Sequence, residues 1–120
     1  MASKSEKRIT LSIKGRDWAF ILMTDKSFDK LYNANENAED NNNAAMTLTG
    51  NAYEVHFRKS DWDIVKIRHE IGHVLYRMSL VNDASHTPDQ VEETFCQIIG
   101  HHGPEIELWT DRVAERFFED

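Results

Sequence analysis

The sequence predicts one small α+β domain. Alternating or β-prone runs lie in the first half of the chain, and runs with helical periodicity fill the second half. The chain has 120 residues, and 40% of them are hydrophobic. This is enough for one hydrophobic core and too little for two. We therefore expect a single domain over residues 1–120. Its N-terminal mixed β-sheet, with an edge hairpin, is followed by a long helix and two further helices.

The N-terminal segment predicts a first hairpin. Residues 1–7 are polar and charged, and we expect them to be disordered. Residues 8–14 alternate between apolar and polar side chains, which is typical of a half-buried strand. Residues 15–17 have turn character. Residues 18–23 form a short apolar run, which favours a second, more buried strand.

A short helix and a loop are expected next. Thr24 or Asp25 can cap a helix that extends to about Tyr32, because both offer a side-chain oxygen to the first backbone amides. Residues 33–44 are rich in Asn and in acidic residues and almost lack large apolar side chains. This composition predicts an exposed loop.

A second hairpin and a long helix follow. Residues 45–49 and 52–57 are β-prone runs on either side of Gly50-Asn51, a pair that favours a tight turn. Ser60 is a suitable N-cap for a helix over 61–80, because acidic residues in the first turn suit the helix dipole.

Two helices are predicted for the C-terminal third. Thr87 caps the first of them, and Pro88 occupies its first helical position. This helix is expected to run to about His101 and to stop at Gly103. A last helix is then expected over 104–118, with one apolar stripe facing the core.

Composition narrows the function classes. The formal net charge is −7, and an acidic chain lacks the clustered Lys and Arg of a nucleic-acid groove or of a surface for anionic lipid. We expect no nucleic-acid partner and no membrane association. The N-terminus has no apolar signal-peptide core, and the only cysteine, Cys96, has no partner for an intramolecular disulfide. A cytoplasmic location is the simplest expectation.

The sequence His-Glu-Ile-Gly-His over residues 69–73 predicts a metal site. His69 and His73 lie one helical turn apart on one face, so both imidazoles can reach one ion. Glu70 is offset around the helix and can take a proton from water activated by the metal. The plain alternative is an exposed helix with two surface histidines. Zinc is the expected ion, although the pattern leaves its identity open.

A zinc site of this kind needs a third protein ligand and an open position for water. Glu92 and Glu93 on the following helix are the candidates, and the pattern alone leaves the choice open. Gly72 costs about 1 kcal/mol in a helix interior relative to Ala, which suggests close approach by another element. Cys96 and Gly100 would let two helices come together beside Glu93.

At this point the chain resembles the gluzincin branch of the zincin metallopeptidases. That family carries His-Glu-x-x-His on one helix and a ligand Glu on the next, and the resemblance covers about residues 45–103. In thermolysin-like members the second helix reads Glu, two residues, a small residue, Asp, two apolar residues, Gly. This chain reads Glu93-Thr94-Phe95-Cys96-Gln97-Ile98-Ile99-Gly100. The resemblance therefore implies Glu93 as third ligand, with Gln97 replacing the Asp that usually hydrogen-bonds a ligand His.

The resemblance also implies a compact zincin-like fold, similar in size to minigluzincins and ImmA/IrrE-type metallopeptidases. The expected activity is zinc-dependent hydrolysis of a peptide or protein substrate. Residues 45–49 would be the edge strand that pairs with the substrate backbone. Tyr76, His86, His101 and His102 are the candidates for a group that stabilises the oxyanion, and spacing favours none of them. The alternative function is a zincin-fold module that binds a partner protein with little turnover.

Overall fold

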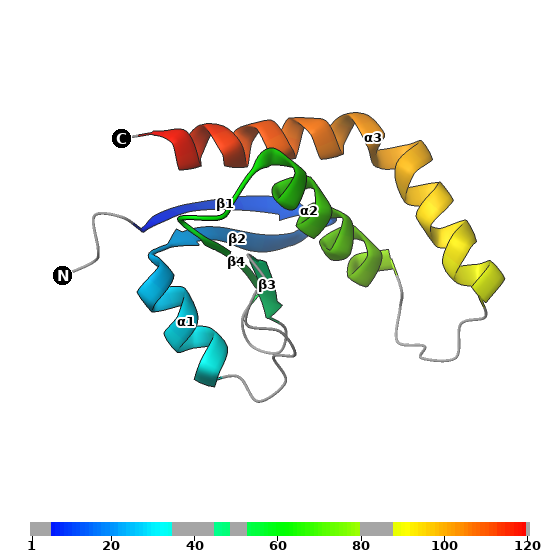
Figure 1. Ribbon diagram of the computed structural model, residues 1–120. Coiled ribbons are helices and arrows are strands. Elements are labelled where there is room, and N and C mark those ends of the chain that lie inside the picture. The colour runs from blue at the N-terminus through cyan, green and yellow to red at the C-terminus, as the bar shows by residue number, and fades with distance from the viewer. Residues whose placement is uncertain (1–5, 35–44, 49–52, 80–87, 120) are drawn as a thin grey trace.

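The protein is an α+β domain, as predicted. The computed structural model describes residues 6–34, 45–48, 53–79 and 88–119. A four-stranded mixed sheet has the order β1-β2-β4-β3, with helices on both sides of it (Figure 1). The elements are β1 (Lys7–Ile13), β2 (Arg16–Met23), α1 (Asp25–Ala34), β3 (Ala45–Leu48), β4 (Glu54–Arg58), α2 (Ile64–Ser79) and α3 (Pro88–Phe118).

The first hairpin is confirmed. β1 and β2 pair antiparallel, and Ile13 lies opposite Arg16. The two residues between them, Lys14 and Gly15, have φ values of 53° and 82°. Positive φ at both positions is typical of a type I′ turn, whose twist matches that of the strands. Lys7 belongs to β1, so the disorder expected for residues 1–7 is wrong there, and residues 1–5 lie outside the described ranges.

The second hairpin forms the other half of the sheet. β4 pairs parallel with β2 and antiparallel with β3. The strand pair agrees with the expected hairpin, although its turn, Gly50-Asn51, lies outside the described residues. β3 has β4 as its neighbour and stands at one edge of the sheet, as the resemblance implied.

One face of the sheet carries the main core. Alternate residues of β1, β2 and β4 point to this face, and α2 and the second half of α3 cover it. α2 contributes Ile67, Ile71, Val74 and Leu75 to this core, whereas Ile64 at its start is 41% exposed. The fully buried core side chains include Ile13, Phe20, Val55, Phe57, Ile67, Ile71, Val74, Leu75 and Val113.

The opposite face of the sheet is partly covered by α1. The hydroxyl of Thr24 accepts a hydrogen bond from the Ser27 amide at 3.1 Å, so Thr24 is the cap. Phe28 is fully buried, and the Arg58 guanidinium lies 4.6 Å from its ring centroid. The helix extends through residue 34, so the loop expected over 33–44 is wrong for residues 33 and 34; residues 35–44 lie outside the described ranges.

The two C-terminal helices predicted from the sequence are one. α3 runs without interruption from Pro88 to Phe118 and contains Pro104. Pro104 has no N–H to donate to the preceding turn, and this weakens the helix without ending it. Figure 1 shows the resulting bend, where the colour changes from yellow to orange. No helix in the described part of the chain is long and apolar enough to cross a membrane.

Candidate metal centre

Two histidines of α2 come together as the sequence predicts. His69 and His73 are one turn apart, and their Nε2 atoms lie 3.1 Å from each other. The ring centroids are 4.7 Å apart with an interplanar angle of 77°. Both residues are exposed, because the opposite side of α2 carries the core residues Ile67 and Ile71. The amphipathic pattern of the helix therefore leaves the two imidazoles available to a ligand.

The donor set fits a divalent cation. Two nitrogen ligands about 2.05 Å from a tetrahedral zinc ion are about 3.3 Å apart, close to the separation of the two Nε2 atoms. Without a cation, one neutral imidazole can donate its Nε2–H to the other, and the distance fits that bond as well. Imidazole nitrogen is a preferred ligand of zinc and of several other divalent metals.

Glu70 brings a carboxylate to the same place. Its Oε2 atom lies 3.8 Å from the Nε2 atom of His69, and its side chain is only 12% exposed. Ligand atoms of His69, Glu70 and His73 all lie within 4.8 Å of one another. A carboxylate here can bind a cation directly or accept a proton from a water beside it.

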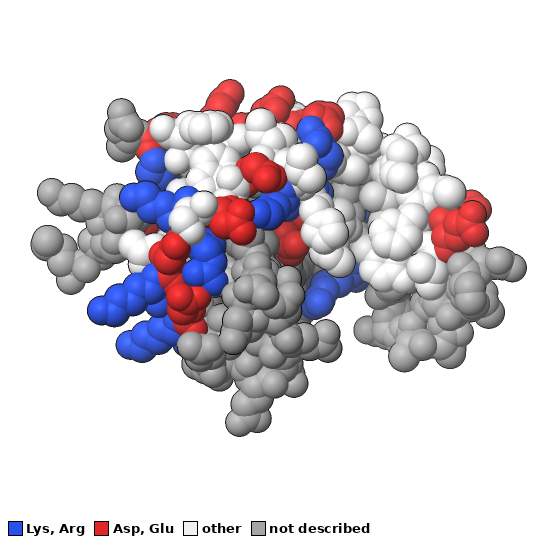
Figure 2. All heavy atoms as spheres, viewed as in Figure 1, with Lys and Arg blue, Asp and Glu red and all other residues white. Residues whose placement is uncertain are grey.

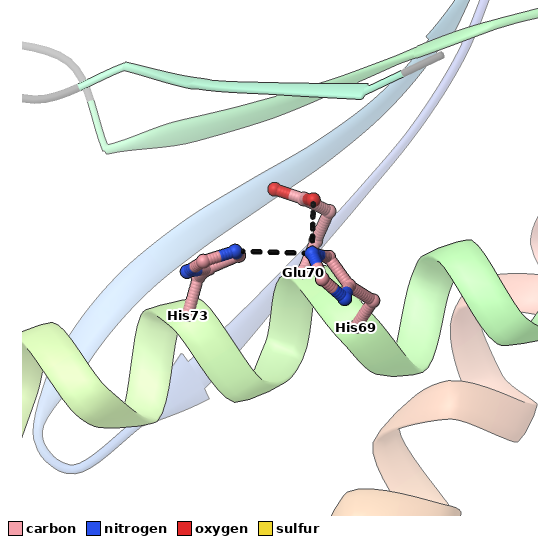
Figure 3. A group of neighbouring side chains, drawn as sticks. All are labelled: His69, Glu70 and His73. Atoms are coloured by element: carbon pink, nitrogen blue, oxygen red, sulfur yellow. Dashed lines mark hydrogen bonds and ion pairs between the residues drawn. The ribbon is translucent and has the colours of Figure 1, made fainter. Parts of the chain in front are cut away.

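The group opens toward the edge of the sheet. In Figure 3 all three side chains rise from one side of α2, the side on which β3 and β4 lie, while α3 lies on the other side. α2 contacts both β3 and α3. A ligand that reaches the histidines therefore meets the edge strand on one flank.

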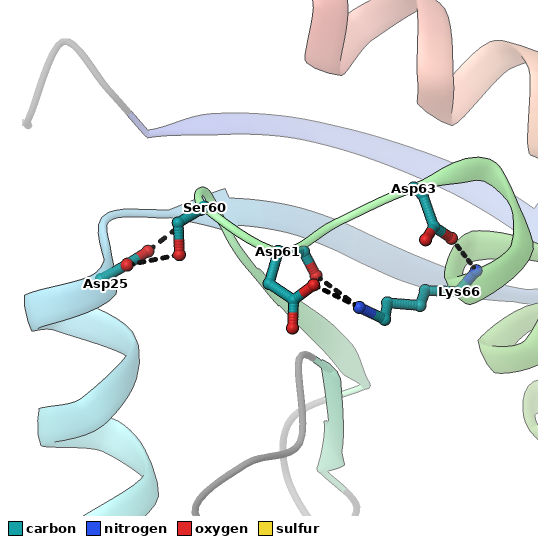
Figure 4. Close-up of polar contacts among 5 residues, drawn as sticks. All are labelled: Asp25, Ser60, Asp61, Asp63 and Lys66. Atoms are coloured by element: carbon teal, nitrogen blue, oxygen red, sulfur yellow. Dashed lines mark hydrogen bonds and ion pairs between the residues drawn. The ribbon is translucent and has the colours of Figure 1, made fainter.

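The start of α2 differs from the prediction. Asp63, not Ser60, is the cap: its carboxylate accepts a hydrogen bond from the Lys66 amide at 2.8 Å (Figure 4). Ser60 instead donates its backbone N–H and its hydroxyl to Asp25, the first residue of α1. These two bonds lower the pKa of the Asp25 carboxyl. The linker that leads into α2 is thus tied to α1.

The structure does not bring Glu93 to the histidines. α3 contacts α2 through an Arg68–Glu107 ion pair of 2.7 Å and through Phe95, which stacks on Tyr76. At 3.6 residues per turn, Glu93 lies roughly 160° around α3 from Phe95, and it is absent from the group of neighbouring donors among the described residues. The Glu93 carboxylate accepts a 3.4 Å hydrogen bond from Gln97. Gln97 therefore contacts the predicted ligand, whereas the family's Asp contacts a ligand His.

Glu92 is no closer to completing the site. It lies roughly 60° around α3 from Phe95, nearer the side that faces α2. It is nevertheless absent from the group of neighbouring donors found among the described residues, which consists of His69, Glu70 and His73. The choice between the two glutamates stays a prediction.

The small residues do not mark a close helix contact. A Cβ added at Gly72 or at Gly100 would meet nothing within 4 Å, and Cys96 is exposed. The expectation that Gly72 makes room for another element, and that Cys96 and Gly100 let α3 approach α2, is therefore wrong. The helices meet instead through long side chains.

The oxyanion candidates are scattered. Tyr76 stacks on Phe95 with ring centroids 4.7 Å apart, and His101 is exposed. The Nδ1 atom of His102 lies 2.8 Å from a Glu105 carboxylate oxygen. His86 lies outside the described residues. None of these side chains belongs to the group of neighbouring donors around His69 within the described ranges.

Sequence reasoning missed one unusual histidine. His56 of β4 is 3% exposed, and its Nδ1 atom has no hydrogen-bond partner among the described residues. Its Nε2 atom lies 3.3 Å from a Glu54 carboxylate oxygen. Burial lowers the pKa of His56, and the nearby Glu54 carboxylate partly opposes that shift. The alternation of side chains along β4 could have predicted that His56 lies on the α1 side of the sheet. It could not have predicted that His56 is buried.

Comparison of the chain with protein-family models, with curated proteins and with solved structures gives no match. The assignment of this centre therefore rests on its own geometry.

Proposed function

We propose that this protein is a zinc-dependent metallopeptidase with a zincin-like fold, which hydrolyses peptide bonds in a peptide or protein substrate. One observation carries the proposal: two imidazole nitrogens 3.1 Å apart, beside a mostly buried carboxylate. An edge strand that contacts the same helix supports it, because such a strand can pair with an extended peptide.

Metal binding, proton transfer and substrate binding are assigned to different residues of the site. His69 and His73 would hold the cation, which supplies Lewis acidity toward a carbonyl and lowers the pKa of water when it is bound. Glu70 accepts the proton of the attacking water and returns it to the leaving amine. β3, at the edge of the sheet, would pair with the substrate backbone and hold it extended, so that its carbonyl faces the histidines.

Glu70→Gln tests the mechanism, because Gln keeps the shape of the side chain and cannot act as a base. We expect the purified variant to retain one equivalent of zinc by elemental analysis. Its cleavage of a mixed peptide library should fall by about 10²- to 10⁴-fold. His69→Ala is the control that should lose both metal and activity. Normal cleavage by Glu70→Gln would falsify the role of base, and loss of zinc from it would make Glu70 a ligand instead.

The third ligand needs its own test. Glu93 is proposed on the resemblance alone, and its neighbour Glu92 provides a matched control of the same chemistry. If Glu93 binds the ion, Glu93→Gln should weaken zinc affinity by at least about tenfold in a chelator competition, and Glu92→Gln should leave it unchanged. Equal affinities in both variants would remove Glu93 from the site.

A binding module is the second candidate function. It is favoured by the position of Glu93, which leaves two histidines and Glu70 as the neighbouring donors within the described residues. A metal held this way would order the surface around α2 for a partner protein, with little turnover. In that case the wild-type protein and Glu70→Gln would leave the peptide library equally intact, and both would still bind zinc.

A further inference from the structure

The metal centre needs one more protein ligand than its close group provides. A catalytic zinc ion is held by three protein side chains, and with Glu70 as the base only His69 and His73 remain in the group. The sheet offers no candidate among its described residues. β3 consists of Ala, Met, Thr and Leu, and Glu54 and His56 of β4 lie on the face of the sheet away from α2. In the described part of the chain, α3 is therefore the element that can supply the ligand.

Two contacts fix which part of α3 lies beside the histidines. Tyr76 stacks on Phe95, and Arg68 pairs with Glu107, so α2 and α3 run antiparallel. The two histidines lie between Arg68 and Tyr76 along α2. The stretch of α3 that is level with them therefore lies between Phe95 and Glu107. Glu93 comes before this stretch, toward the end of α2.

The angular position around α3 selects His102 within this stretch. His102 follows Phe95 by seven residues, which is two turns, so it lies roughly 20° from Phe95 on the side that meets α2. Cys96 and His101 lie roughly 100° and 120° away from Phe95. Residues 94–104 contain no Asp or Glu, and Figure 2 shows uncharged atoms over most of this part of the molecule. Before Pro104, His102 is therefore the donor that shares a side with Phe95.

Glu105 holds His102 in the tautomer that a metal ligand needs. A Glu105 carboxylate oxygen lies 2.8 Å from the Nδ1 atom of His102. Because a carboxylate accepts hydrogen bonds, Nδ1 carries the proton, and the neutral imidazole then offers its Nε2 lone pair to a cation. A carboxylate behind the imidazole is a common arrangement around metal-binding histidines. The His102 side chain is only 22% exposed, which limits the orientations of the ring.

We propose that His102 is the third protein ligand of the metal centre, in place of Glu93, and that Glu105 orients its imidazole. The proposal rests on the proposed peptidase function. Three imidazoles are a ligand set that catalytic zinc sites use. This set keeps Glu70 in the role of base.

Metal binding must draw His102 toward the histidines of α2. Its ring is not part of their group, in which the ligand atoms lie within 4.8 Å of one another. There is room for this movement beside Gly72, because a Cβ there would meet nothing within 4 Å. The Glu105 side chain is 51% exposed and can follow the imidazole.

A titration with zinc alone tests the assignment on the wild-type chain. Long-range ¹H–¹⁵N spectra of the ¹⁵N-labelled protein separate the two ring nitrogens of each histidine. We expect one equivalent of zinc to shift the Nε2 signals of His69, His73 and His102. His101 is the matched control, because it is the next residue on the same helix and is exposed. Its signals should not move.

Zinc affinity of variants, measured by chelator competition, gives an independent readout. We expect His102→Ala to weaken binding by at least about 100-fold, and Glu105→Gln by about tenfold, since the latter removes only the partner behind the ring. His101→Ala and Glu93→Gln should bind zinc as the wild type does. The spectra of the wild type decide the matter if His102→Ala fails to fold.

The outcomes separate this ligand from the peptidase function. An unmoved His102 signal, or equal affinities of His101→Ala and His102→Ala, would overturn the assignment and return the third position to Glu93, with the peptidase function intact. Zinc binding through His102 without cleavage of the peptide library would keep the ligand and remove the peptidase function. A wild-type chain that binds no zinc would overturn both.

Discussion

The two halves of α3, before and after Pro104, differ in how much of their apolar surface they bury. In the second half, Val113 and Phe117 are 0% and 3% exposed and pack against the sheet. In the first half, Ile98 is 4% exposed, whereas Phe95 and Ile99 are 45% and 67% exposed. Both halves are amphipathic by sequence. The difference shows that periodicity tells which residues share a face, whereas the layer above that face decides whether it is covered.

The largest expected effect is a loss of stability at Phe117, in the second half of α3, with its neighbour Phe118 as the comparison. Phe117 meets the rings of Phe57 and Trp62, each with centroids 5.4 Å away. We expect Phe117→Ala to lower the free energy of unfolding by about 3–5 kcal/mol, measured by urea denaturation, because it leaves a cavity in the core. Phe118 is 69% exposed, and Phe118→Ala should cost less than about 1 kcal/mol. Similar losses in both variants would break the contrast between buried and exposed positions.

Lowering the pH should reduce the stability of the protein through the buried His56 of β4, but not through the exposed His101 of α3. The lowered pKa of His56 means that the unfolded chain takes up a proton before the folded protein does. Stability is therefore present above about pH 6.5 and is lost as the pH falls toward the folded pKa. The slope is at most about 1.4 kcal/mol per pH unit for this one group.

Urea denaturation at pH 7.5, 6.5 and 5.5 measures this loss. His56→Leu should flatten the dependence of stability on pH, whereas the exposed His101, changed to Gln, should leave it as in the wild type. An unchanged slope in His56→Leu would show that other groups carry the acid sensitivity.

The smallest expected effect is a gain in stability from a substitution in the first half of α3. A Cβ at Gly100 would meet nothing within 4 Å, so Gly100→Ala should raise the free energy of unfolding by about 0.5–1 kcal/mol through helix propensity alone. The same substitution at Gly15, whose φ is 82°, should destabilise the protein. Thermal melting of both variants makes the comparison. A loss at Gly100 would reveal a close neighbour on this half of the helix.

Helix ends show where sequence reasoning was limited. Ser60 and Asp63 are both good caps, and local preference cannot choose between them. The tertiary structure makes Asp63 the cap, because the backbone N–H and the hydroxyl of Ser60 donate hydrogen bonds to Asp25 at the start of α1. The end predicted at Gly103 also failed. Buried side chains on both sides of Pro104, such as Ile98 and Trp109, hold the two halves in one helix despite its cost of about 3 kcal/mol.

The sequence by itself determined the α+β class, the strand pairs of the two hairpins and the meeting of His69, Glu70 and His73. All of these follow from spacings that backbone hydrogen bonds impose within one helix or one pair of strands. Only the tertiary structure decided that Glu93 lies outside the group of His69, Glu70 and His73 and that Phe95 and Ile99 stay exposed. The rotation of α3 against α2 depends on the packing of residues far apart in the chain, such as Arg68 with Glu107, and no local spacing encodes it.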